Sequence, residues 1–151
     1  METESSTQDN YVKQFSVFLI NRAGALLGVV KLLEDASIHV LALSIHDSVD
    51  VTIVRLIVSD PEGVETLFME RGIPYGTCDL LVVELRKGPE DLSKCFRAFL
   101  EAETNIHFAY PVIVRPEGHA LLALHLEDTD LGAVVMTNHG FKTLRQKDLS
   151  R

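Results

Sequence analysis

Stretches rich in β-branched and aromatic residues alternate along this chain with segments whose apolar residues recur on one helical face. In the first half, the pattern predicts strands over 14–20, 38–46, 51–59 and 73–79, with helices over 25–36 and between Asp60 and Gly72. In the second half it predicts strands over 80–85, 106–115, 119–127 and 141–144, a first helix lined by Leu92, Phe96 and Phe99, and a second helix over 128–139. The order strand, helix, strand, strand, helix, strand therefore occurs twice.

The two halves also align with each other residue by residue. An offset of 66 residues places Val17 on Val83, and after the central hairpin an offset of 68 places Gly72 on Gly140. Few aligned pairs are identical. The inference of an internal repeat depends on the shared order of elements, with one two-residue gap in a loop.

This element order predicts the α+β class: two ferredoxin-like βαββαβ units in tandem, each an antiparallel four-stranded sheet with both helices on one face. We expect a disordered leader over 1–13, a first domain over 14–79 and a second over 80–149, with a frayed charged tail over 145–151. Units of about 65 residues have small cores and exposed sheet edges, so we also expect a homodimer.

Composition narrows the class of partner. The 151 residues are 46% hydrophobic and 24% charged, which is typical of a globular protein. A net charge of −8 argues against nucleic acid and anionic membrane as partners. Residues 1–10 lack the features of a secretory signal, and no apolar run approaches the roughly 18 residues of a membrane helix. Cys78 and Cys95 have no metal or redox spacing, so we expect a cytoplasmic protein with packed or idle thiols.

The segment between the first strand and the first helix, residues 21–26, is the best candidate for ligand chemistry. Gly24 permits a tight approach, and the backbone N–H groups of Gly24, Ala25 and Leu26 would point out of the helix N-terminus. That arrangement suits a carboxylate or a phosphate. The alternative is an ordinary strand-to-helix turn that uses Asn and Gly for capping.

The motif Asn-Arg-x-Gly-x-Leu lies between the first strand and the first helix, and residues 37–40 or 104–106 open the second strand of each copy. In these two features the chain resembles the ACT domain family. The resemblance covers residues 14–149 as two consecutive domains. It implies a small regulatory sensor that binds an amino acid and regulates a metabolic enzyme. It also implies a ligand between two paired domains, held by the first loop of one and by a polar residue early in the second strand of the other.

The two copies match this family pattern unequally. The first loop has Ala23 where the family usually has Pro, and in the second loop Glu90 takes the place of the helix-start glycine. At the second-strand position, copy one has His39 and copy two has Asn105. The resemblance thus implies one intact composite site, the first loop with Asn105, and a degenerate one in which the second loop meets His39.

We therefore predict one amino acid per chain, with its carboxylate on the N–H groups of the first loop and its ammonium on the side-chain oxygens of Asn21 and Asn105. The predicted ligand-binding residues are Asn21, Arg22, Gly24, Ala25, Leu26 and Asn105. Arg22 has the weakest case, because a loop arginine is usually only solvated.

Other chemistry has little support in the sequence. The six histidines lack metal-ligand spacing, and the acidic run 127–130 suits a helix start better than calcium. No nucleotide loop, nucleophile elbow or zinc-protease motif occurs, so we expect no catalytic residue, no metal, no cofactor and no enzyme activity. The alternative function is a ligand-free ACT-like interaction or oligomerisation module, which the departures at Ala23 and Glu90 support.

Overall fold

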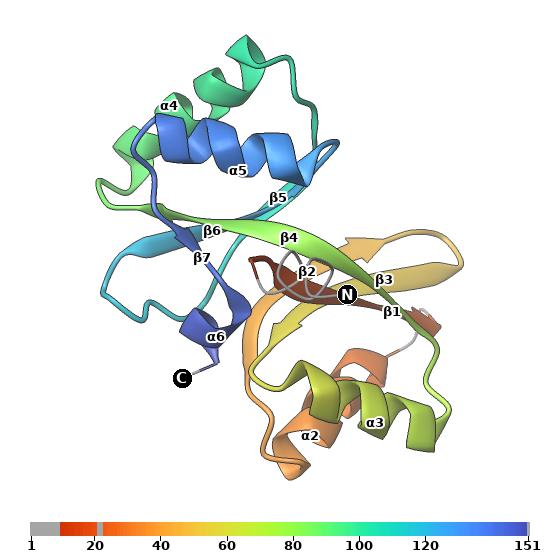
Figure 1. Ribbon diagram of the computed structural model, residues 1–151. Helices are drawn as coiled ribbons and strands as arrows, with labels where there is room; N and C mark the ends of the chain where they lie inside the picture. The colour runs from red at the N-terminus through yellow and green to blue at the C-terminus, as the bar shows by residue number, and fades with distance from the viewer. Residues whose placement is uncertain (1–9, 21–22, 151) are drawn as a thin grey trace, which may run out of the picture. The chain divides into compact units, whose positions relative to one another are not determined.

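The computed structural model describes residues 10–20 and 23–150, which form two compact units (Figure 1). The N-terminal unit contains Lys13–Cys78 and Ser150, and the C-terminal unit contains Asp79–Leu149 together with residues 10–12. Strand β4 spans Tyr75–Leu85, so its first residues belong to the N-terminal unit and the remainder to the C-terminal unit. The fourth strand of one repeat thus runs without a turn into the first strand of the next.

The N-terminal unit has the ferredoxin-like order. Its elements are β1 (Val12–Ile20), α2 (Ala25–Asp35), β2 (Val40–Asp47), β3 (Val51–Val58), α3 (Pro61–Arg71) and the start of β4. The strands lie in the order β2-β3-β1-β4, and β3 is antiparallel to both β1 and β2. Both helices pack on the same side of this sheet (Figure 1).

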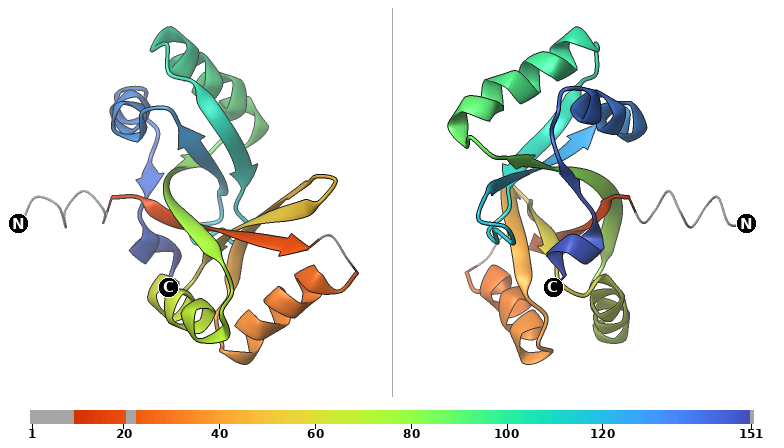
Figure 2. Two further views of the ribbon diagram at one scale, coloured as in Figure 1. Left: turned by 90° about the vertical axis from the view of Figure 1, so that its right-hand side faces the viewer. Right: turned by 60° about the vertical axis from the view of Figure 1, so that its left-hand side comes forward.

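The C-terminal unit repeats the plan. It contains the rest of β4, then α4 (Pro89–Glu101), β5 (Ile106–Pro111), β6 (Ala120–Leu126), α5 (Thr129–Asn138), β7 (Thr143–Leu144) and α6 (Gln146–Leu149). Strand β4 pairs with β6 and β7, and β6 pairs with β5, all antiparallel. The order β7-β4-β6-β5 is the order of the N-terminal unit, and the predicted fold of two ferredoxin-like units is confirmed. Figure 2 shows the helix pair of each unit from two further sides.

The cores of the two units use equivalent positions of the repeat. The aligned core pairs are Phe15/Leu81, Val17/Val83, Leu33/Phe99, Leu56/Leu124 and Phe68/Met136, each residue at most 1% exposed. In the N-terminal unit the ring of Phe15 meets the ring of Phe68 edge-on, with the centroids 6.1 Å apart. The aromatic positions differ between the copies while the buried positions stay the same, as expected when total core volume is conserved.

The second helix of each unit begins as the sequence predicts. The Asp60 carboxylate accepts the N–H of Gly63 at 3.1 Å at the start of α3. The Asp128 carboxylate accepts the N–H of Leu131 at 3.0 Å at the start of α5. These caps satisfy backbone donors that the helix itself leaves unpaired, so the acidic run 127–130 has a structural role.

The first strand begins two residues earlier than the sequence predicts. Strand β1 begins at Val12, inside the predicted leader 1–13, and Tyr11 packs against the core of the C-terminal unit. The Tyr11 hydroxyl donates a hydrogen bond to the Asp130 carboxylate, and burial together with that carboxylate raises the pKa of Tyr11. Residues 1–9 of the leader lie outside the described residues.

Three further expectations are corrected in the C-terminal unit. Phe96, predicted to line the first helix, is 39% exposed, while Cys95 and Ala98 face the core with Phe99. Strand β5 ends at Pro111 instead of residue 115, because the chain bends at Ile113, just after the N–H of Val112 donates to the carbonyl of Leu121 at 3.1 Å. The tail predicted to fray forms α6, which buries Leu149.

Two helical glycines give a matched test of core packing. A Cβ at Gly132 in α5 would lie 2.2 Å from Leu126 Cδ1, whereas a Cβ at Gly28 in α2 would meet no atom within 4 Å. Both substitutions to alanine gain about 1 kcal/mol of helix propensity, but only Gly132→Ala overpacks the core, at about 1–3 kcal/mol. In urea denaturation we expect Gly28→Ala to raise the free energy of unfolding. The free energy of unfolding of Gly132→Ala should be lower than that of Gly28→Ala by the packing cost. If both variants change the free energy of unfolding by the same amount, the close contact of Gly132 with Leu126 is contradicted.

The buried thiol predicts a pH dependence of stability. Burial raises the pKa of Cys95 to about 11, while an unfolded thiol ionises near 8.5. Between those pH values the unfolded state loses a proton that the native state keeps, so stability falls as the pH rises. We expect the free energy of unfolding to decrease from pH 8 to pH 10.5 more steeply in the natural chain than in Cys95→Ala. Cys78→Ala is the control that should retain the steeper decrease.

Candidate functional site

The start of α2 presents backbone donors. Gly24 precedes the helix with φ 88°, a left-handed conformation that favours glycine. The first helical hydrogen bond runs from the N–H of Gly28 to the carbonyl of Gly24 at 2.9 Å. The N–H groups of Ala25, Leu26 and Leu27 therefore precede the helical ladder, and no described residue accepts a hydrogen bond from them.

The other long helices in the described part of the chain begin differently. Aspartate side chains cap α3 and α5, as above. Helix α4 carries Glu90 and Asp91 in its first turn, and the Asp91 carboxylate accepts the N–H of Lys87 at 3.0 Å. Helix α2 has no acidic residue in its first turn and no described side-chain cap. Its positive end is therefore not neutralised by a described carboxylate, which favours an anionic group from outside.

The structure corrects the comparison of the two loops. The offset of 66 aligns Glu90 with Gly24, but α4 begins earlier and its N-cap is Gly88, with φ 61°. The helix-start glycine is therefore retained in the second copy. What distinguishes the second loop is the pair of acidic residues in the first turn of α4, which would repel a ligand carboxylate.

Asn105 lies just before β5 and its side chain is held by a carboxylate. Asn105 Nδ2 donates to Glu127 Oε2 at 2.9 Å, and the Asn105 carbonyl accepts the N–H of Glu127 at 2.9 Å. His39 occupies the same place in the N-terminal unit, where its carbonyl accepts the N–H of Ser59 at 2.9 Å. By sequence, Glu127 belongs only to the acidic run 127–130. Its alignment with Ser59, which follows the third strand beside the start of the second, is the one sequence signal for its contact with Asn105.

The predicted site residues are distributed over both units. Gly24, Ala25 and Leu26 belong to the N-terminal unit and Asn105 to the C-terminal unit. Asn21 and Arg22 lie outside the described residues.

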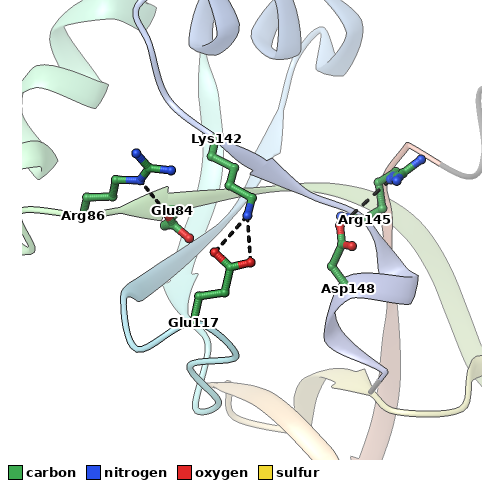
Figure 3. A network of polar contacts seen from close by, with 6 residues as sticks. All are labelled: Glu84, Arg86, Glu117, Lys142, Arg145 and Asp148. Carbon is green, nitrogen blue, oxygen red and sulfur yellow. Dashed lines mark hydrogen bonds and ion pairs between the residues drawn. The ribbon is translucent and has the colours of Figure 1, made fainter.

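A charged hollow of about 350 Å³ lies at the start of α4 in the C-terminal unit. Among its lining residues Glu84, whose side chain is 1% exposed, accepts a hydrogen bond from Arg86 Nε at 2.7 Å (Figure 3). Lys142 Nζ lies 2.9 Å from both oxygens of Glu117. These contacts raise the pKa of Arg86 and Lys142 and lower the pKa of Glu117. Arg86 and Lys142 are thus paired with carboxylates of the chain itself.

A second hollow of about 430 Å³ lies beside α2 and β2 in the N-terminal unit. Its lining residues are Val30, Glu34, Ser37, Ile38, His39 and Val40. His39 therefore lines a hollow, although by sequence it belongs to the degenerate site.

In the part of the chain that is described, no group of three or more His, Cys, Asp or Glu residues could hold a metal ion. No helix within 10–20 and 23–150 is both long and apolar enough to cross a membrane.

Residues 10–151 match a family model described as an ACT domain pair. The chain belongs to the ACT domain family. This confirms the resemblance inferred from the first loop, and it makes the chain a regulatory ligand-binding module, since an ACT domain pair is a regulatory and not a catalytic domain.

Solved structures share this fold at low sequence identity. Protein BT0572 from Bacteroides thetaiotaomicron is 24% identical, with a TM-score of 0.85 over 94% of this chain and 97% of that one. The regulatory subunit of aspartate kinase from Thermus thermophilus is 16% identical, with a TM-score of 0.56 over 87% and 94%. A structure titled aspartokinase alpha and beta subunits is 14% identical, with a TM-score of 0.59, and the match covers 87% of this chain and 93% of that one. A search of curated proteins finds no match.

The ion pairs of the C-terminal unit predict unequal effects on stability. Removing Arg86 would leave the buried Glu84 carboxylate without its cation, whereas removing Lys142 would leave Glu117 exposed to water. We expect Arg86→Met to lower the Tm clearly and Lys142→Met to change it little in calorimetry. The double variant Glu84→Gln/Arg86→Met should recover part of the loss. Equal Tm values for the two single variants would contradict this account.

Proposed function

We propose that this ACT domain pair binds one amino acid per chain, through the start of α2 and Asn105, and regulates a partner in response. The observation that supports the proposal best is the N-terminus of α2, which has a left-handed glycine, no acidic residue in its first turn and no cap from a described side chain. The other three long helices begin with carboxylates of their own. An α-carboxylate would supply the missing negative charge.

The carboxylate would accept hydrogen bonds from the N–H groups of Gly24, Ala25 and Leu26. The helix dipole adds to this attraction. Asn21 and Arg22, which precede these residues, complete the proposed loop. Asn21 would accept from the ammonium, and Arg22 would add positive charge beside the carboxylate.

Asn105 would bind the ammonium of the same amino acid. Its Nδ2 group donates to Glu127, which leaves Oδ1 as the acceptor for an ammonium N–H. The Glu127 carboxylate next to it adds negative charge, and charged partners strengthen such hydrogen bonds. Glu127 is therefore included in the proposed site as the residue that orients Asn105.

Thermal-shift measurements against the twenty amino acids test this function. A ligand at a hundred times its dissociation constant adds about 2.7 kcal/mol of stability. We expect one amino acid, or a small group of similar ones, to raise the Tm. If none does at millimolar concentration, amino-acid binding by this chain is excluded in that range and the interaction module is favoured.

Substitutions in the two halves of the site test the assignment. Asn21→Ala and Asn105→Ala should each weaken binding about fivefold, since each loses a hydrogen bond of roughly 1 kcal/mol. His39→Ala changes the position equivalent to Asn105 in the other copy and is the matched control, with unchanged affinity. Full affinity in both asparagine variants would contradict the site.

A charge substitution at the helix start separates binding from folding. Leu27 is 62% exposed in the first turn of α2, where a Glu side chain can reach back to the backbone N–H groups at the helix start. Leu27→Glu should keep or raise the Tm and weaken amino-acid binding several-fold. Leu100→Glu makes the same charge change at an exposed position of α4 and should leave binding unchanged. Unchanged binding in Leu27→Glu would exclude the start of α2 as the carboxylate site.

The alternative function, a ligand-free interaction or oligomerisation module, has one structural feature in its favour. The exposed apolar residues of α4 and α5 are Phe96, Leu100, Leu131 and Val134. Exposed apolar surface of this kind often marks a contact with another protein.

For either function we propose a homodimer that acts on a metabolic enzyme in trans in the cytoplasm. Sedimentation with and without the amino acid measures the oligomeric state.

A further inference from the structure

Two histidines of the C-terminal unit lie side by side on neighbouring strands. His107 is on β5 and His125 is on β6, with their Nδ1 atoms 3.3 Å apart and their ring centroids 5.0 Å apart. Spacing along the sequence did not predict this pair, because 18 residues separate its members. Only the pairing of β5 with β6 brings the two imidazoles together.

A β-bulge positions His107. In the pairing of β5 with β6, Ile106 is opposite Leu126 and Phe108 is opposite His125, with a register shift between them. His107 is the extra residue of the bulge. A bulge places two residues opposite one and redirects a side chain, so His107 and Phe108 both reach His125. The ring of Phe108 stacks on that of His125, with centroids 4.7 Å apart.

The N-terminal unit has the same bulge with different chemistry. Its register shift lies between Val40 and Ala42, and Ala42 is opposite Ile57. The repeat offsets therefore align Leu41 with His107 and Ile57 with His125. Leu41 and Ile57 are buried. The fold thus accepts an aliphatic pair at these positions, and the backbone does not require the two histidines.

We propose that His107 and His125 bind a divalent transition-metal ion, such as Zn²⁺, Ni²⁺ or Cu²⁺, through their two Nδ1 atoms. Zinc binds imidazole nitrogen at about 2.0–2.1 Å with tetrahedral angles, which places two ligand nitrogens about 3.3–3.4 Å from each other. The observed Nδ1 separation of 3.3 Å matches this spacing. Imidazole is a good ligand for these three ions.

The site has two protein ligands. Among the described residues no third His, Cys, Asp or Glu joins the pair to form a larger group. Water fills the remaining coordination positions, so the ion binds less tightly than in a structural site with four protein ligands. The metal site and the amino-acid site are tested separately, because the proposed metal ligands include none of the residues proposed to bind the amino acid.

Titration of the full chain with Zn²⁺ alone, in a non-coordinating buffer and followed by calorimetry, tests the proposal. We expect one ion per chain, and an affinity at least tenfold lower in His107→Leu/His125→Ile. That variant carries the aliphatic pair of the other copy, and its far-UV circular dichroism reports whether it folds. The single variants His107→Ala and His125→Ala should each lose affinity to a similar extent. The controls are His39→Ala and His46→Ala, which change exposed histidines and should retain the affinity for Zn²⁺.

A second measurement reads the ligands directly. Nitrogen ligands of bound Cu²⁺ are detected in electron paramagnetic resonance through their coupling to the unpaired electron, so the natural chain with one equivalent of Cu²⁺ should show coupling to imidazole nitrogen and His107→Leu/His125→Ile should lack it. The proposal is overturned if the natural chain binds no Zn²⁺ up to millimolar concentration, or if the double variant binds it equally well. An equal loss in the His39 or His46 variant would also overturn it, because binding would then come from scattered surface histidines.

Discussion

Each unit depends on the burial of one face of a four-stranded sheet beneath two helices. About 65 residues offer few side chains for this purpose, so the same small set of positions is buried in both copies. Phe15 and Leu81 occupy one such position, and Phe68 and Met136 another, all nearly inaccessible to water. The residue types differ, but none of them is polar. Hydrophobic burial constrains the inner positions of the strands and helices and leaves the loops between them largely unconstrained.

Positions that the core does not use are therefore the ones at which the two copies can differ in chemistry. The second helices of the two units need their aspartate caps, because Asp60 and Asp128 satisfy backbone donors there. The first helices begin from glycines in a left-handed conformation, Gly24 and Gly88, and their first turns differ in charge. One backbone arrangement thus carries a first turn without acidic residues in one copy and a first turn with two acidic residues in the other. A duplicated domain can diverge in this way at no cost to its core.

The second strand of each unit shows the same division between backbone and side chain. Its bulge occurs in both copies, at Leu41 and at His107, because the hydrogen-bonding pattern of the strand is part of the fold. The side chains at the bulge differ completely in polarity. Glu127 and Ser59 likewise occupy equivalent places beside the second strand, yet only Glu127 holds an amide side chain. Polar contacts thus surround β5 in the C-terminal unit, whereas the equivalent bulge in the N-terminal unit is aliphatic.

The sequence by itself determined the repeat, the ferredoxin-like order of elements and the caps at Asp60 and Asp128. These features depend on local periodicity and local hydrogen bonding, which neighbouring residues encode. It also pointed to Gly24 and Asn105, through a short motif and its position in the repeat. The contact of Asn105 with Glu127 and the pairing of His107 with His125 were decided only by the tertiary structure, since each joins residues on different elements. The true start of α4 at Pro89 also required the structure, because an alignment with a constant offset hides a helix that begins earlier.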